Sequence, residues 1–208
     1  MTEFYFVRHG ETLVNARHAF NGGLVDEPLT SRGIAAAKAV GKALAPVAFA
    51  QIVTSSMPRA VTTAKLVAAA SRYRPPLSLA DGLREMRLGQ WDGHTIAEVK
   101  ASEAFGVYFH DPVRFDAEYA ARYEIEPYRH ALARSRAVIA ATYAAHPSGK
   151  VLIVAHGLIF QLLLNTLLGV PFAALREPPM LHNATISELE TRDGEHFVKR
   201  RWDYRPQD

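Results

Sequence analysis

The chain has 208 residues, a formal net charge of +3 with neutral histidines, and 49% hydrophobic and 22% charged residues. These values are typical of a folded globular domain and exclude a disordered chain. The chain has no cysteine, which excludes disulfides, a thiolate nucleophile and sulfur-based zinc sites.

The first half of the chain is predicted to alternate between strands and helices. Residues 4–7 are an apolar run before Arg8-His9-Gly10, which predicts a buried strand followed by a tight turn. Thr30 or Ser31 is the expected cap of a helix. The residues expected on the buried face of that helix are Ile34, Ala37, Gly41 and Leu44.

A second strand is predicted over residues 51–54 and a helix over residues 59–70. Ser55 and Ser56 offer hydroxyl groups to cap this helix, and Pro58 suits its first turn. Residues 77–80 predict a short strand. Residues 88–126 are polar, aromatic and irregular, which we interpret as an inserted subdomain or lid within a single domain spanning residues 1–208.

The last third continues the alternation. The expected elements are a helix over 128–145, a strand over 151–155, a helix over 158–168, and a hairpin of strands 186–189 and 197–200 around Asp193-Gly194. This order predicts an α/β fold: a three-layer domain with a mainly parallel central sheet flanked by helices, with a small, mostly helical insertion.

Apolar runs are too short to cross a membrane, because such a span needs roughly 18 residues. The chain start also lacks a signal-peptide pattern, so we expect a cytoplasmic protein with no membrane partner. The densest basic cluster, Lys199-Arg200-Arg201, is interpreted as a solvated edge rather than a nucleic-acid patch. The small excess of positive charge favours an anionic small molecule as a binding partner.

Charged and polar side chains follow three of the predicted strands. They are Arg8-His9, the segment 55–59 and His156-Gly157. Ligands of parallel sheets bind beyond the carboxyl ends of the strands, so these segments are expected to converge. Arg8 and Arg59 are permanently charged forks that match phosphate oxygens. Asn15 adds a neutral donor, and the sequence therefore predicts a phosphate site.

The alternative use of the histidines is a metal site formed by His9, His18, His110 and His156. Such a site would lack the carboxylates and short ligand spacings that metal sites favour. We therefore expect no metal and no other cofactor.

Five sequence blocks resemble one known family. Residues 8–12 read RHGET and are followed by Asn15; the other blocks are residues 20–30, 54–60, 83–93 and 154–157. They resemble, in order, the motifs of the histidine phosphatase superfamily, which includes the cofactor-dependent phosphoglycerate mutases. The resemblance implies a phosphoglycerate mutase-like fold.

The same resemblance implies a role for each matching residue. His9 would be the nucleophile that becomes phosphohistidine, and Glu85 the proton donor and acceptor. The phosphate clamp would be Arg8, Arg59 and His156, assisted by Asn15 and the backbone of Gly157 and Leu158, with Asn21 and Gly22 in the substrate loop. From the residues alone, Glu85 could instead form a surface ion pair with Arg84 or Arg87, and Glu11 competes as the acid.

The resemblance implies a histidine acid phosphatase-type phosphomonoesterase acting on a small phosphorylated metabolite. The first alternative is a cofactor-dependent phosphoglycerate mutase. However, residues 101–112 lack the paired arginines of those mutases, which favours hydrolysis. The second alternative is a phosphate-binding relative without turnover. Dimers are common among such proteins, so a homodimer stays open.

Overall fold

The computed structural model describes residues 1–206, which fold around a six-stranded sheet with the strand order β3-β2-β4-β1-β5-β6. Strands β1 (Thr2–Arg8), β2 (Gln51–Ser55), β3 (Leu77–Ala80) and β4 (Gly149–Ala155) are parallel. Strands β5 (Ile186–Thr191) and β6 (Phe197–Tyr204) form an antiparallel hairpin on the β1 edge. The predicted α/β class and mainly parallel sheet are confirmed.

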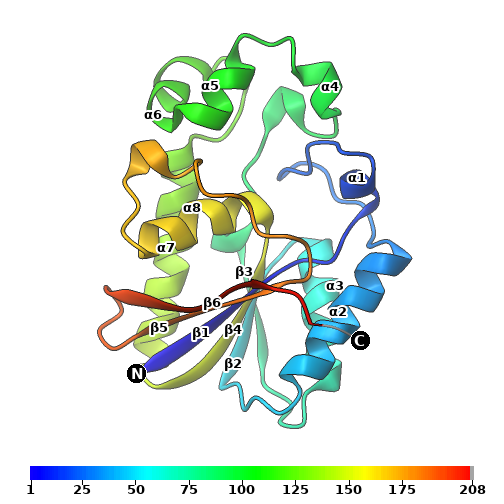
Figure 1. Cartoon of the computed structure of the whole chain (residues 1–208), viewed down its shortest axis with the longest axis vertical. Helices are drawn as coiled ribbons and strands as arrows, with labels where there is room; N and C mark the ends of the chain where they lie inside the picture. The colour runs from blue at the N-terminus through cyan, green and yellow to red at the C-terminus, as the bar shows by residue number, and fades with distance from the viewer. Residues whose placement is uncertain (207–208) are drawn as a thin grey trace.

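Helices cover both faces of the sheet (Figure 1). Helices α2 (Ser31–Leu44) and α3 (Pro58–Ala70) lie on one face; α7 (Tyr128–Ala145) and α8 (Gly157–Leu167) lie on the other. Strand β1 serves both layers because successive side chains point to opposite faces. Tyr5 and Val7 pack in the α2–α3 core, whereas Phe4 and Phe6 pack in the α7–α8 core.

The insertion lies beyond one end of the sheet, at the top of Figure 1. The 3-10 turn η1 (Asp81–Leu83) precedes it, after β3. The elements of the insertion are η2 (Gly89–Trp91), α4 (Ile96–Val99), α5 (Ala104–His110), α6 (Pro112–Arg114) and the π-helical turn η3 (Phe115–Tyr119). Aromatic side chains hold it together; the ring centroids of Trp91 and Tyr108 are 5.2 Å apart. These rings belong to the same hydrophobic cluster as the α7–α8 core. A lid function for this segment stays a prediction.

Two details of the helical predictions are wrong. Ile34 is exposed, because the buried face of α2 includes Gly33 and Val40 beside Ala37, Gly41 and Leu44. Gly33 packs so closely on the backbone of Glu11 that a Cβ there would lie 2.2 Å from the carbonyl oxygen. Helix α3 begins after Met57 with no side-chain cap. Ser55 Oγ contacts His156 and accepts from the N–H of Met57, at 3.3 Å, which lies before the first turn.

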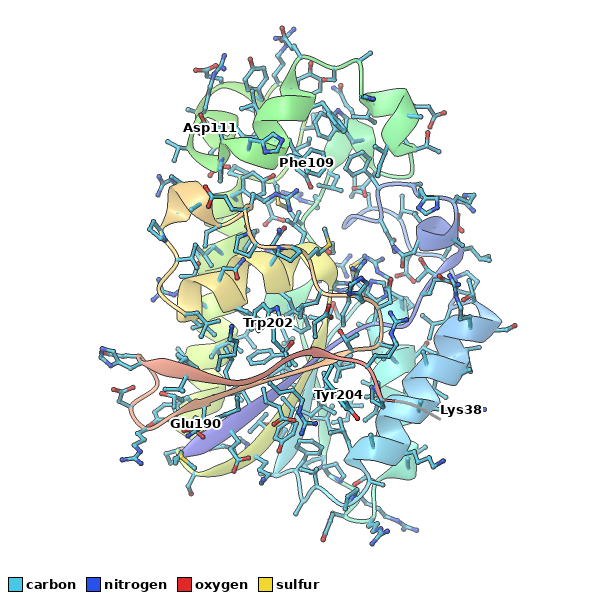
Figure 2. The ribbon with its side chains drawn as sticks, in the orientation of Figure 1. Lys38, Phe109, Asp111, Glu190, Trp202 and Tyr204 are labelled. Carbon is cyan, nitrogen blue, oxygen red and sulfur yellow. The ribbon has the colours of Figure 1, made fainter. Side chains whose placement is uncertain are left out.

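The remaining short elements are α1 (Leu13–Ala16), which follows β1, and η4 (Phe172–Ala174), which follows α8. Within residues 1–206, no helix combines the length and apolar character needed to cross a bilayer. The basic cluster on β6 pairs with β5: Arg200 contacts Glu190, and Arg201 contacts Glu188 at 3.3 Å. Figure 2 shows Glu190 far from the insertion.

Candidate active site

The segments predicted to converge do meet at the carboxyl ends of three strands. Arg8 lies beside Ala155 in the register of β1 and β4, so the two following histidines are neighbours. The ring centroids of His9 and His156 are 5.2 Å apart, and both side chains are buried. Arg59, from the first turn of α3, donates a hydrogen bond to His156.

The His9 ring is held with one nitrogen available. Its Nδ1 lies 2.7 Å from the carbonyl oxygen of Gly10, and because a carbonyl can only accept, Nδ1 carries the proton. In the neutral ring Nε2 then keeps a free lone pair. Burial, followed by the charges of Arg59 and Arg8, lowers the pKa of His9 well below its usual value. The ring is therefore neutral near neutral pH, with Nε2 unprotonated.

His156 is neutral too, but both of its nitrogens are occupied. Arg59 Nε donates to Nδ1 at 3.2 Å, and since a guanidinium can only donate, Nδ1 carries no proton. The proton is on Nε2, which donates to Ser55 Oγ at 2.7 Å. Burial and the charge of Arg59 lower the pKa of His156 well below its usual value.

Arg59 uses its whole guanidinium inside the protein. Nη1 donates to the Val25 carbonyl (2.7 Å) and to Asp26 (2.8 Å). Nη2 donates to the carbonyls of Asn21 (3.1 Å) and Gly22 (3.0 Å). With Nε on His156, all five N–H groups have acceptors. In this structure Arg59 holds the loop of residues 21–26 against α3. A phosphate oxygen could bind to Arg59 only by replacing one of the loop oxygens that now accept its hydrogen bonds.

Arg8 keeps free donors. Its Nη1 donates to the Leu181 carbonyl at 2.5 Å, whereas its buried Nε has no partner among residues 1–206. Gly157 allows this placement, because a Cβ there would lie 2.8 Å from Arg8 Cζ. Arg8 is thus a predicted clamp residue that already offers an N–H group to an anion.

Glu85 is buried against the start of α8, with 6% of its surface exposed. Its Oε1 accepts from the N–H groups of Met86 and Ile159, each at 3.0 Å, and Oε2 accepts from Leu158 at 3.0 Å. Free N–H groups at a helix start favour such a carboxylate. A surface ion pair with Arg84 or Arg87 is therefore wrong, and the Leu158 N–H, expected to assist phosphate, is occupied.

The other predicted residues lie around this centre. Asn15 Oδ1 accepts from the backbone of Thr12 at 3.2 Å, and Asn21 Nδ2 donates to Thr12 Oγ1 at 3.0 Å. Asn183, which the sequence analysis missed, links the group, since its Nδ2 lies 2.9 Å from the His9 carbonyl oxygen and 3.4 Å from Asn15 Oδ1. It follows η4 at a distance in sequence, and no local motif marks it.

The competing residues lie elsewhere. Glu11 faces α2, where its carboxylate pairs with Arg32 and accepts from Thr30 at 2.8 Å. His18 and His110 are exposed, away from the buried pair His9 and His156. Among residues 1–206, no three histidine, aspartate or glutamate side chains are placed to hold a metal ion.

The comparisons with known proteins agree with this geometry. A model of the histidine phosphatase superfamily (branch 1) matches residues 4–204. The chain belongs to this superfamily. It is 30% identical over 193 residues to a Yersinia pestis protein named probable phosphoglycerate mutase GpmB, covering 93% of this chain and 86% of that protein.

Solved structures of the superfamily share the fold. Bacillus stearothermophilus YhfR superposes with a TM-score of 0.87 at 29% identity, over 98% of both chains. A mycobacterial glucosyl-3-phosphoglycerate phosphatase superposes with a TM-score of 0.83 at 26% identity, over 97% of this chain and 98% of that one. This member of the superfamily is thus related to proteins named as mutases and as phosphatases.

Replacing Arg59 is expected to destabilise the protein. Arg59→Met leaves three buried or partly buried loop carbonyls without their donor and removes the contact with the solvent-accessible Asp26, so we expect the free energy of unfolding to fall by about 3–5 kcal/mol. Urea denaturation measures this. Arg32→Met, at an exposed ion pair, is the matched control and should lower the free energy of unfolding far less. Equal losses of unfolding free energy in the two variants would contradict the role of Arg59 in stabilising the loop.

The buried histidines also make stability depend on pH. Their folded-state pKa values are lowered, so below about pH 6.5 the unfolded chain binds protons that the folded chain does not. Stability should fall as the pH drops from 6.5, by up to ~1.4 kcal/mol per pH unit for each histidine. Urea denaturation between pH 5 and 7 should show a shallower slope in His156→Gln, but not in His110→Gln.

Proposed function

We propose that this chain is a phosphomonoesterase that hydrolyses a small phosphorylated metabolite through a phosphohistidine on His9, without a metal. The observation that carries the proposal is the His9 ring, whose Nε2 is left free by the Nδ1 contact with Gly10. Arg8 supplies a free donor beside this ring, and the charge of Arg59 lies close enough to lower the His9 pKa.

In the first step, His9 Nε2 attacks phosphorus and the bond to the leaving oxygen breaks. That oxygen takes a proton from the Glu85 carboxyl. In the second step a water attacks the phosphohistidine, gives its proton to Glu85, and releases inorganic phosphate and neutral Nε2. Oε2 suits this role, because it has one N–H partner whereas Oε1 has two. Charge on the transferring group is offset by arginines, as such reactions require.

The side chains that line the cavity next to Glu85 favour hydrolysis over mutase activity. The segment that carries paired arginines in the mutases supplies Tyr108 and Phe109 to the cavity here. A mutase must hold a small, polar second anion next to the phosphohistidine. The apolar walls suit an organic leaving group better. Cytoplasmic location and homodimer formation stay predictions.

The test is a panel of phosphomonoesters assayed for inorganic phosphate release in the presence of a chelator. Release from several esters, with little isomerisation of 3-phosphoglycerate in the presence of the bisphosphate, supports the proposal. Efficient isomerisation with slow hydrolysis would establish the mutase alternative. Phosphate binding without turnover of any ester would establish the non-catalytic alternative, and a loss of activity on chelation would contradict metal independence.

A further inference from the structure

A cavity of about 160 Å³ opens next to the candidate catalytic residues. Arg8, Glu85 and Leu158 line its catalytic end, and its other walls are mainly apolar: Ala19, Phe20, Leu88, Ile96, Phe109 and Met180. Figure 2 shows Phe109 on the side of α5 that faces the rest of the molecule. An apolar cavity of about 150 Å³ is known to hold benzene, so this space fits one ring with small substituents.

One buried cation lines this cavity outside the catalytic group. Arg176 follows η4 and is 8% exposed. Its guanidinium lies over the rings of Tyr108 (4.8 Å to the centroid) and Phe109 (5.1 Å). No carboxylate within residues 1–206 forms an ion pair with it, and its buried Nε has no hydrogen-bond partner.

The guanidinium is fixed in place. Its Nη1 donates to Gln161 Oε1, and the amide of Gln161 in turn donates to the carbonyl oxygens of Arg176 (3.3 Å) and Pro178 (2.5 Å). Aromatic faces offset part of the cost of burying this charge. However, a buried cation without an anionic partner is costly, and an unpaired N–H adds to that cost. An anion in the cavity would remove both costs.

We propose that Arg176 binds a carboxylate on the leaving group of the substrate. The substrate class is then a phosphomonoester in which an apolar or aromatic body separates the phosphate, at His9 and Arg8, from a carboxylate at Arg176. This inference rests on the proposed phosphatase function. It differs from a small polar acid such as a glycerate, which would leave the walls formed by Phe20, Leu88 and Ile96 unfilled.

The test compares 4-carboxyphenyl phosphate with phenyl phosphate. We expect the wild type to prefer the carboxylated ester in kcat/KM, and Arg176→Met to lower that ratio about 10- to 100-fold. Arg176→Lys, which keeps the charge, should restore part of the preference. The matched control is Arg129→Met, since Arg129 also lies over an aromatic ring (Phe172, 4.0 Å) but does not line the cavity. An unchanged ratio in Arg176→Met overturns the inference.

A second measurement needs no variant, in case Arg176→Met does not fold. The methyl ester of 4-carboxyphenyl phosphate has the better leaving group, so chemical reactivity alone favours it over the carboxylate. We expect the wild type to hydrolyse the carboxylate at least about 10-fold better in kcat/KM. Equal or faster hydrolysis of the methyl ester refutes the role of Arg176 while leaving the phosphatase function intact. No release from any ester refutes the phosphatase function itself.

Discussion

Replacing His9 by alanine is expected to lower kcat for every phosphomonoester by at least about 10⁴-fold, as removal of a covalent nucleophile does in other enzymes. The physical reason is that no other described side chain offers an unprotonated ring nitrogen at the site: both nitrogens of the neighbouring His156 are occupied by Arg59 and Ser55. The variant should also lose the acid-labile phosphate label that the wild type acquires from substrate during rapid quenching.

The matched control is His110→Ala, because His110 is exposed at the end of α5 and belongs only to the rejected metal group. Its activity and labelling should equal those of the wild type. Thermal unfolding of both variants separates loss of chemistry from loss of fold. Near-normal turnover, or persistent labelling, in a folded His9→Ala protein would show that another group is the nucleophile.

The elements of this fold could be predicted from local sequence because each carries its own signal. The apolar run before Arg8, the capping Thr30 and the turn Asp193-Gly194 all act over a few residues, and the structure has β1, α2 and the β5–β6 hairpin there. The convergence of strand ends followed from the parallel sheet alone. Ile34 was misplaced because the burial of Gly33 is set by contact with a distant backbone, that of Glu11.

The contacts within the site could not be predicted in the same way. Ser55 was interpreted as a helix cap, but its hydroxyl group is hydrogen-bonded to His156, 101 residues later in the sequence. Glu85 was expected near the phosphate, yet it accepts two N–H groups from the start of α8, more than 70 residues later in the sequence. Arg176 had no motif at all. Its significance comes from burial beside aromatic rings that lie far from it in sequence.

The sequence gives no sign that all five N–H groups of Arg59 donate hydrogen bonds within the protein, and this arrangement affects binding. The loop of residues 21–26 supplies four of its five acceptors, so the loop holds the guanidinium where an incoming phosphate would need it. Asp92 holds the same loop from the insertion, since its Oδ2 accepts from Leu24 N–H at 3.2 Å and Leu88 N–H at 2.9 Å. Phosphate binding at Arg59, as proposed, would therefore be coupled to the contact between this loop and the insertion.

Replacing Glu85 by glutamine is expected to slow the hydrolysis of alkyl phosphates by about 10²- to 10⁴-fold, the usual contribution of a positioned acid. An alkoxide is a poor leaving group until it receives a proton, whereas 4-nitrophenolate leaves without one. The same variant should therefore lose much less activity toward 4-nitrophenyl phosphate in the phosphorylation step. Single-turnover release of alcohol or nitrophenol measures that step directly.

This dependence on the leaving group separates acid catalysis from a structural role. Glutamine keeps the size of Glu85 and one of its two acceptor oxygens, so the start of α8 loses a single acceptor for the N–H groups of Leu158 and Ile159. Any resulting shift of Leu158 or Arg8 would slow both classes of ester alike. Glu11→Gln is the matched control, because Glu11 pairs with Arg32 away from the His9 ring, and it should leave the ratio of alkyl to nitrophenyl rates unchanged. Equal losses for both esters in Glu85→Gln would refute its role as the acid and leave it as the residue that anchors α8.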